Sequence, residues 1–353
     1  MEEMNKIKIF ARMIYVACPA GLRTGGPELL HQLVFTLNKL GKKADIVYYK
    51  TDEWNQTIVT EYQQYISNYL LEKDVVDCEE NLIIVPETNV KFLSKFKKIQ
   101  KAIWWLSVDN FFKVYDLNKE AMKYYSEYRL VFLKKRVKFF LKKTFNKKCI
   151  WGIDDVKKMN INFNLCQSYY ALDFCQRHGL KNILYLSDYI NDYFLSPQIL
   201  DVKEDIILYN PKKGFKFTKK ILACGTEFNF IPLINMSRDD ICNMMRKAKI
   251  YMDFGNHPGK DRMPREACML GCVVITGLRG SANFNQDVCI PSEYKFGDFN
   301  KNVKNIVQKI QFVLKNYDIN YANMHQYKMM IEEEKNQFLK NVEDIFVKRN
   351  EDE

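Results

Sequence analysis

The first fifty residues constrain the fold most strongly, because they predict a strand, a glycine turn, a helix and a second strand in succession. Residues 13–18 form a short apolar run rich in β-forming side chains, and residues 44–49 form another. Between them, residues 28–40 carry apolar side chains at helical spacing, and Gly41 stands where a helix C-cap is expected. Since a strand–helix–strand crossover is right-handed and joins parallel strands, this opening predicts a parallel α/β sheet.

The remaining sequence repeats this alternation in two consecutive stretches. Further short apolar runs stand at residues 81–85, 102–106, 163–166, 182–185, 205–209, 219–223, 228–233, 250–254 and 272–276. Helical or polar segments separate them, so we expect two doubly wound, Rossmann-like α/β domains, in agreement with a length of 353 residues. The charge-rich segment 195–204 is the expected boundary. We therefore predict an N-terminal domain over 1–200, a C-terminal domain over 201–320 and a helical segment over 321–353.

Charge is concentrated in one segment. The net charge is +11, of which residues 128–148, with nine Lys and Arg and no acidic residue, supply +9. On a helix, one face of this segment would hold Phe132, Leu133, Val137, Phe140 and Leu141. Such a basic amphipathic helix favours contact with an anionic membrane surface, and packing on its own domain is the alternative. Aromatic side chains among lysines also bind nucleic acid, but we do not expect nucleic acid as a partner.

Cysteine usage and hydropathy bear on location. The ten cysteines include no Cys-x-x-Cys pair and are accompanied by four histidines, so the sequence predicts a reducing compartment and no zinc site. No apolar run approaches the roughly 18 residues of a spanning helix. The run at 13–18 is interpreted as a buried strand rather than a signal peptide, because Arg12 interrupts the apolar stretch. We expect a cytoplasmic protein, peripheral on the inner face of the cell membrane where segment 128–148 binds lipid.

Two loops have the composition of ligand sites. The first, Gly25-Gly26-Pro27-Glu28, follows the first strand and opens a helix. Glycines let the backbone approach a ligand closely, and a helix N-terminus attracts anions. The spacing matches neither the dinucleotide fingerprint nor a Walker loop, so an ordinary tight turn is the alternative.

The second loop covers residues 255–266 and reads GNHPGKDRMPRE. Lys260 and Arg262 flank the start of the helix predicted at 264–270, which predicts a phosphate site. Glu266 follows in the first turns of this helix, where a carboxylate accepts hydroxyls such as those of a ribose. A solvated charged loop with a capped helix is the alternative.

With these residues in place, the chain resembles a glycosyltransferase of the two-domain GT-B type, nearest to the family 4 and polysaccharide-biosynthesis group. Members carry a motif of Glu, seven residues and Glu, followed by Ala, a spacer and Gly. Glu266, Ala267 and Gly271 match its second half, whereas Pro258 stands where the first glutamate is expected. The resemblance implies that Glu266 holds the ribose of a nucleotide sugar. His257 and Asp261 are the candidates to substitute for the missing glutamate.

Other segments extend the resemblance. Lys213, in the segment 210–214, matches the lysine that binds the donor diphosphate, and Gly280-Ser281 resembles the later part of that site. Gly25 and Gly26 belong to a loop resembling the one that faces the donor phosphates and the acceptor. Residues 103–112 resemble a stretch of polysaccharide-biosynthesis members. The resemblance also implies that the two domains face a central cleft and that the helical segment 321–353 packs back on the N-terminal domain.

Glycosyl transfer needs a stabilised diphosphate leaving group and, for inversion, a base on the acceptor hydroxyl. Lys213, Lys260 and Arg262 could neutralise a diphosphate, and the sequence has no Asp-x-Asp pair to hold a bridging metal. We therefore expect a metal-independent reaction with no cofactor beyond the nucleotide sugar. Asp109 is the first candidate base, with a loop-capping role as its alternative.

Glu28 and Glu87 are the other candidate bases on the N-terminal half, and His257 is a catalytic candidate on the C-terminal half. We accordingly predict an enzyme that moves a sugar from a nucleotide-sugar donor to a glycan or lipid-linked acceptor, in surface polysaccharide or glycolipid synthesis. A nucleotide-sugar epimerase of the same fold is one alternative. A non-catalytic binding protein is the other, and Pro258 is the residue that keeps it open.

Overall fold

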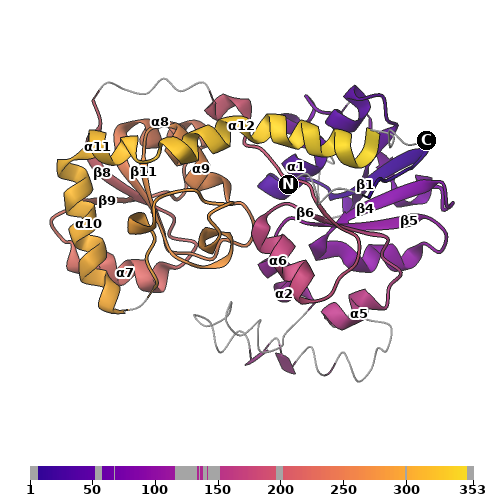
Figure 1. Ribbon diagram of the computed structural model, residues 1–353, viewed down its shortest axis with the longest axis horizontal. Coiled ribbons are helices and arrows are strands. Elements are labelled where there is room, and N and C mark those ends of the chain that lie inside the picture. The colour runs from indigo at the N-terminus through magenta and orange to yellow at the C-terminus, as the bar shows by residue number, and fades with distance from the viewer. Residues whose placement is uncertain are drawn as a thin grey trace. The chain divides into compact units, whose positions relative to one another are not determined.

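The computed structural model describes residues 7–51, 58–66, 68–115, 133–134, 136–137, 141, 152–195, 202–298 and 300–347. The chain divides into two compact units, and each is described by itself (Figure 1). Unit 1 contains Met1–Asp188 and Asn336–Glu353, and unit 2 contains Tyr189–Lys335. The assignment of roles to residues 1–200, 201–320 and 321–353 stays a prediction.

Unit 1 is built on a seven-stranded sheet in the order β3-β2-β1-β4-β5-β6-β7, in which all neighbouring strands are parallel. Its strands are β1 Met13–Pro19, β2 Ala44–Tyr49, β3 Leu70–Leu71, β4 Asn81–Pro86, β5 Gln100–Trp105, β6 Phe163–Cys166 and β7 Ile183–Tyr185. The central strands β1 and β4 are buried on both faces, as their continuous apolar runs require. The order reverses between β1 and β4, so the carboxyl ends of these two strands form the switch point where such sheets bind ligands.

Helices α1 Gly25–Lys39, α2 Val108–Val114, α5 Ile153–Lys157 and α6 Tyr169–Arg177 belong to the same unit. The predicted helix after the first strand is α1, and its apolar stripe is buried. It ends as expected at Gly41, which takes a left-handed φ of 79°. The Gly41 N–H donates to Asn38 O at 3.0 Å, which satisfies one of the last helical carbonyls.

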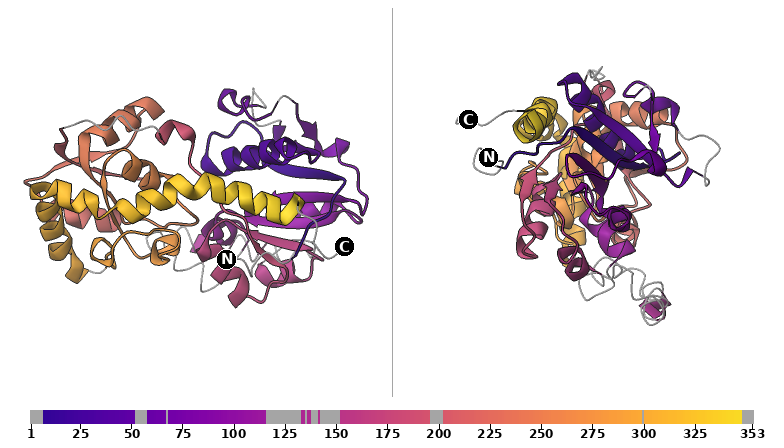
Figure 2. Two further views of the ribbon diagram at one scale, coloured as in Figure 1. Left: turned by 45° about the horizontal axis from the view of Figure 1, so that its top comes forward. Right: turned by 90° about the vertical axis from the view of Figure 1, so that its right-hand side faces the viewer.

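The last part of the chain completes unit 1 (Figure 2). Helix α12, His325–Val342, belongs to unit 2 up to Lys335 and to unit 1 from Asn336. Within unit 1 the Ser187 N–H donates to Asn341 Oδ1 at 3.3 Å. Beyond the helix, the Ile9 N–H donates to Ile345 O at 2.8 Å. The core of unit 1 therefore includes residues that follow unit 2 in the sequence.

Unit 2 has a four-stranded parallel sheet in the order β11-β10-β8-β9. Its strands are β8 Glu204–Tyr209, β9 Asn229–Pro232, β10 Ala248–Asp253 and β11 Val273–Thr276. Its helices are α7 Phe215–Cys224, α8 Arg238–Lys247, α9 Arg262–Met269, α10 Val303–Lys315, α11 Tyr317–Ala322 and the first part of α12. These elements share one hydrophobic core. The apolar run at 219–223 lies in α7, and the strand order reverses between β8 and β10.

Two parallel sheets with connecting helices confirm the predicted fold class of doubly wound, Rossmann-like α/β units. Among the described residues, no helix combines the length and the apolar character that crossing a bilayer requires.

Lys203, just before β8, is a buried cation with a structural role. Its Nζ donates to the carbonyl oxygens of Met245 at 3.0 Å, Ala248 at 3.3 Å and Leu270 at 2.7 Å. These carbonyls lie at the C-terminal ends of α8 and α9, where helices leave acceptors without intrahelical partners. Burial lowers the pKa of Lys203 to about 8.

We predict that Lys203→Met destabilises the protein by roughly 2–3 kcal/mol, because three buried carbonyls lose their ammonium donor. Urea unfolding of wild type and variant measures this cost. Lys247→Met, at an exposed position of α8, is the matched control and should change stability by less than about 0.5 kcal/mol. Equal effects of the two substitutions would contradict the structural role of Lys203.

Candidate functional site

Three loops of unit 2 meet at the carboxyl edge of its sheet. Residues 210–214 follow β8, residues 254–261 follow β10, and residues 277–283 follow β11. Because the strand order reverses between β8 and β10, these loops surround the switch point of the sheet. Apart from Gly25 and Gly26, which lie in unit 1, the residues predicted from the sequence to bind the donor come from these three loops and from α9.

The loops after β8 and β10 touch each other through glycines. Gly214 has a left-handed φ of 62°, and an added Cβ there would lie 2.3 Å from the carbonyl oxygen of Phe254. At Gly255 an added Cβ would lie 2.4 Å from the Cβ of Lys213. Only glycine permits this approach, so these two glycines hold the loops after β8 and β10 in contact beside Lys213.

The loop after β11 fastens the loop after β10 in the same way. Gly280 has a φ of 58°, and a Cβ there would lie 1.9 Å from the carbonyl oxygen of His257. The Ser281 N–H donates to that oxygen at 2.8 Å, and Ser281 Oγ donates to Gly259 O at 2.6 Å. Gly280 and Ser281 thus hold residues 257–259 in position, and their predicted contact with the donor stays a prediction.

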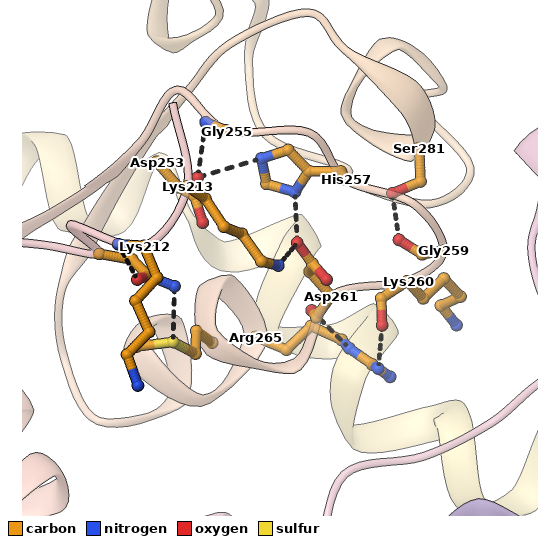
Figure 3. A network of polar contacts seen from close by, with 12 residues as sticks. Lys212, Lys213, Asp253, Gly255, His257, Gly259, Lys260, Asp261, Arg265 and Ser281 are labelled. Carbon is orange, nitrogen blue, oxygen red and sulfur yellow. Dashed lines mark hydrogen bonds and ion pairs between the residues drawn. The ribbon is translucent and has the colours of Figure 1, made fainter. Parts of the chain in front are cut away.

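A network of polar contacts runs through these loops (Figure 3). Lys213 Nζ lies 2.7 Å from Asp261 Oδ2, and the same carboxylate oxygen lies 3.4 Å from Nδ1 of His257. The other ring nitrogen, Nε2, lies 3.7 Å from Asp253 Oδ1. His257 is fully buried, whereas about a third of the Lys213 side chain is exposed. Within this network, Lys213 is therefore the side chain that a ligand in solvent can reach.

Asp253 is held by its own strand and loop. Its Oδ1 accepts the Gly255 N–H at 2.8 Å, and its Oδ2 accepts the hydroxyl of Tyr251 at 3.1 Å. Burial raises the pKa of Tyr251 well above its usual value, so this hydroxyl keeps its proton and donates it. These two hydrogen bonds therefore hold the Asp253 carboxylate next to His257.

One ligand atom from each of Asp253, His257 and Asp261 fits within a 4.8 Å cluster, a spacing that metal sites also show. The two carboxylates, however, face opposite nitrogens of the imidazole ring, and one metal ion binds only one of these nitrogens. Both carboxylates also accept hydrogen bonds from the protein, Asp253 from Gly255 and Tyr251 and Asp261 from Lys213. The three residues therefore belong to one network with Lys213, and the expected absence of a metal stays a prediction.

Lys260 occupies a different environment from the one the sequence suggested. It is buried, and its Nζ lies 2.8 Å from Glu334 Oε1 in α12. Arg265 of α9, also buried, places Nη1 2.6 Å from the other oxygen of Glu334. Arg265 further donates to the carbonyl oxygens of Lys260 at 2.8 Å and Asp261 at 3.3 Å. These contacts fasten the loop to α12, and the predicted contact of Lys260 with phosphate stays untested.

Arg262 and Glu266 lie one turn apart at the start of α9. Arg262 Nε is 3.8 Å from Glu266 Oε1, with about a third of the arginine side chain exposed and the glutamate nearly buried. The loop after β8 lies against this turn, since Asn210 Nδ2 contacts Met263 Sδ at 3.6 Å. The structure thus brings Lys213, Arg262 and Glu266 to one edge of unit 2, as expected for residues that share a ligand.

In unit 1, the predicted residues gather at the carboxyl ends of β1, β4 and β5. Gly25 and Gly26 form the first turn of α1, and Glu28 follows them, nearly buried. An added Cβ at Gly26 would make only an ordinary contact of 3.8 Å with Leu106 Cδ1. Sterics within unit 1 therefore do not require this glycine, which leaves room for its predicted role next to a ligand.

Asp109, the first candidate base, lies in the first turn of α2 rather than in a loop. It is fully buried, and its Oδ1 accepts the hydroxyl of Tyr170 in α6 at 2.8 Å. The aspartate therefore joins α2 to α6. Its catalytic role stays a prediction.

Glu87 follows β4 and is also buried. Its Oε2 accepts the Leu106 N–H at 3.0 Å. Burial raises the pKa of Glu87 to about 8, against the opposing effect of backbone N–H donors from Leu106, Glu87 itself and Ser107. The proton affinity of Glu87 is thus shifted into the neutral range, where proton transfer in catalysis is most efficient.

His31, which the sequence did not single out, anchors the glycine turn. Its Nδ1 lies 2.6 Å from Pro27 O, and its Nε2 lies 2.6 Å from the hydroxyl of Tyr48 in β2. Because a carbonyl only accepts, Nδ1 carries the proton and Nε2 accepts from the tyrosine. Burial lowers the pKa of His31 to about 4, so the ring stays neutral.

The basic segment falls mostly outside the described residues. Within 128–148 the structure describes Leu133, Lys134, Arg136, Val137 and Leu141. The three apolar members of this set are each more than half exposed. Contact with a membrane surface stays a prediction. The stretch 103–112, which carried part of the resemblance, forms the end of β5 and the first turns of α2.

No family model matches the chain, and no curated protein matches it in sequence. Solved structures do match. Staphylococcus aureus TarM with UDP has a TM-score of 0.52 at 12% identity over 76% of this chain, and the chain spans 56% of TarM. Sucrose-phosphate synthase from Thermosynechococcus elongatus has a TM-score of 0.55 at 13% identity over 95% of both chains. Anabaena HepE with UDP-glucose has a TM-score of 0.56 at 10% identity over 94% of this chain and 98% of HepE.

These similarities are similarities of fold. They show that the chain has the two-domain GT-B fold, as the resemblance implied. Nearness to family 4 in particular stays a prediction.

We predict that Gly280→Ala destabilises unit 2 more than a left-handed conformation alone explains. Gly179→Ala is the matched control, because Gly179 has a φ of 66° and an added Cβ there meets nothing within 4 Å. Both variants lose roughly 1–2 kcal/mol to left-handed strain. Gly280→Ala should lose about 2 kcal/mol more, because its Cβ overlaps the His257 carbonyl. Thermal unfolding compares them, and equal losses would mean that the two loops are not in contact.

Glu87 gives a prediction about pH. Since its folded pKa is raised from 4.5 to about 8, the native state binds this proton more tightly than the unfolded state. Its contribution to stability is therefore largest at low pH and declines as pH rises through that window. Glu87→Gln should gain stability relative to wild type across the window, by up to about 1.4 kcal/mol per pH unit. Urea unfolding at several pH values measures this gain, and a difference as flat as that of Glu79→Gln, an exposed control, would contradict it.

Proposed function

We propose that the protein is a glycosyltransferase that uses a nucleotide-sugar donor bound at the carboxyl edge of unit 2. The observation that carries this proposal is the position of Lys213, Arg262 and Glu266 at the switch point of the sheet. The GT-B fold supports it, and both TarM and HepE were solved with uridine nucleotides.

In this proposal Lys213 and Arg262 bind the donor diphosphate, and Glu266 accepts the ribose hydroxyls. The bond between the sugar and the diphosphate breaks with its electron pair going to the phosphate oxygen. The two cations stabilise the charge that develops there. Lys260 contributes indirectly, because its ion pair with Glu334 holds the loop that precedes α9. No metal ion is needed in this scheme.

The acceptor is a sugar hydroxyl of a glycan or a lipid-linked glycan, and its oxygen bonds to the anomeric carbon of the donor sugar as the bond to the diphosphate breaks. The hydroxyl proton passes to a carboxylate of unit 1, for which Glu87, Asp109 and Glu28 are the candidates. Glu87 is favoured by its raised pKa, since a base of this strength takes a proton and releases it near neutral pH. The basic segment 128–148 supports a lipid-linked acceptor and a place in surface polysaccharide or glycolipid synthesis, at the inner face of the cell membrane.

The proposal predicts that one nucleoside diphosphate or monophosphate among UDP, GDP, CMP and dTDP raises the melting temperature of the protein, whereas NAD does not. A ligand at 100 times its dissociation constant adds about 2.7 kcal/mol of stability, which is a shift of several degrees. Lys213→Met and Glu266→Gln should abolish the shift. Lys212→Met, at the exposed neighbouring position, should keep it.

A chain that none of these nucleotides stabilises is not a nucleotide-sugar enzyme, and this result would overturn the proposal. Where a nucleotide binds, its sugar conjugates separate the remaining alternatives. Slow donor hydrolysis without acceptor indicates a transferase. Epimer formation selects an epimerase, and binding with neither reaction selects a non-catalytic protein.

A further inference from the structure

We propose that Asp261 is a positioning residue that holds Lys213 while the site is empty and exchanges it for a protonated His257 when a diphosphate binds. This inference rests on the proposed function, because it requires that Lys213 moves to a phosphate. It assigns a role to a carboxylate at the N-cap position of α9, where an uncompensated negative charge opposes an anionic ligand.

The Asp261 carboxylate and a bound phosphate would compete for the ammonium group of Lys213. Lys213 Nζ donates to Asp261 Oδ2 at 2.7 Å, a short charge-assisted hydrogen bond. Asp261 does not use its side chain to cap α9, although it stands at the N-cap position. A phosphate that takes the ammonium must therefore compete with the carboxylate, and it must also approach that carboxylate closely.

His257 lies close enough to Asp261 to replace Lys213 as its partner. Its Nδ1 lies 3.4 Å from the same Asp261 oxygen that accepts from the lysine. The imidazole is fully buried, and neither ring nitrogen makes a hydrogen bond with the described residues. A small movement of ring or carboxylate converts this contact into a hydrogen bond, provided that Nδ1 carries a proton.

The number of protons on the imidazole ring decides whether it can donate to both neighbouring carboxylates. A neutral imidazole has one N–H, but His257 faces a carboxylate at each nitrogen, Asp261 at Nδ1 and Asp253 at Nε2. With one proton, one nitrogen lone pair must point at a carboxylate oxygen. While the Lys213 ammonium neutralises Asp261, the repulsion between the nitrogen lone pair and the Asp261 oxygen costs little free energy. Once the ammonium has moved to a phosphate, only the doubly protonated ring satisfies both carboxylates.

The groups around the ring support this assignment. Asp253 comes from β10 and Asp261 from the start of α9, and Lys213 comes from the loop after β8. Tyr251 donates to the far oxygen of Asp253 and brings no charge.

The remaining charged groups near the loop are already paired with opposite charges. Among the described residues, Arg279 of the loop after β11 pairs with Asp298 and donates to Asn256, and Arg262 pairs with Glu266. Lys260 and Arg265 pair with Glu334, and Arg265 also donates to the carbonyl oxygen of Asp261. The protonation of His257 is therefore set by the two aspartates and by the position of the Lys213 ammonium.

Diphosphate binding should then take up about one proton from solvent, and the affinity should fall as pH rises. Isothermal titration with inorganic pyrophosphate, and with the nucleotide that stabilises the protein, measures this uptake. The heat of binding is compared in PIPES and in Tris, whose ionisation enthalpies differ. His325→Gln, at an exposed position of α12, is the control and should bind with the same uptake as wild type.

Asp261→Asn separates the positioning role from a merely structural one. The asparagine has nearly the same shape but does not compete for the ammonium. We expect it to bind pyrophosphate about tenfold more tightly than wild type near neutral pH, with no proton uptake and little dependence on pH. Weaker binding by Asp261→Asn would show that the carboxylate only supports the loop, and would overturn the inference.

Two further outcomes separate a failure of this inference from a failure of the proposed function. If wild type binds a diphosphate without proton uptake, the inference fails and the proposed function stands. If no diphosphate binds wild type at millimolar concentration, both fail.

Discussion

The candidate site depends on backbone-to-backbone contact among three loops. Ordinary side chains at positions 214, 255 and 280 would overlap neighbouring atoms at 1.9–2.4 Å, so the loops after β8, β10 and β11 can meet only because these residues are glycines. Their meeting fixes Lys213 and His257 on backbone that cannot easily shift. A chemistry that relies on charges in fixed positions needs this rigidity, since electrostatic stabilisation is strongest where the charges need not reorganise.

A buried ion cluster supplies the second support. Lys260 and Arg265 bring two cations to one carboxylate, Glu334, and all three side chains are nearly inaccessible. Breaking a buried ion pair by removing one partner leaves an uncompensated charge, at a cost of roughly 3–5 kcal/mol. The cluster is therefore a firm anchor. It joins the loop before α9 to α12, an element that follows it by about seventy residues in the sequence.

Continuous apolar runs between polar segments are the direct signal of buried parallel strands, and they placed most of the strands. The run at 219–223 belongs instead to α7, and the two-residue strand β3 is too short to give such a signal. The sequence also located the loops that carry the candidate residues, since parallel sheets bind ligands beyond the carboxyl ends of their strands. It could not separate Lys260 from Lys213. Both are lysines in polar loops next to a glycine, and what distinguishes them is the distant Glu334. The pairing of Asp261 with Lys213 likewise joins residues 48 positions apart, and no local pattern encodes it.

Pro258 takes on a different meaning once the loop is seen. The resemblance places a carboxylate at this position, but a proline there fixes its own φ and offers none. The loop does contain a carboxylate three residues further on, at Asp261, where it contacts Lys213 and His257. In that position it acts on the cation that would hold the leaving group. The chain has therefore not simply lost an acidic residue, because its loop carries a carboxylate whose charge acts on Lys213.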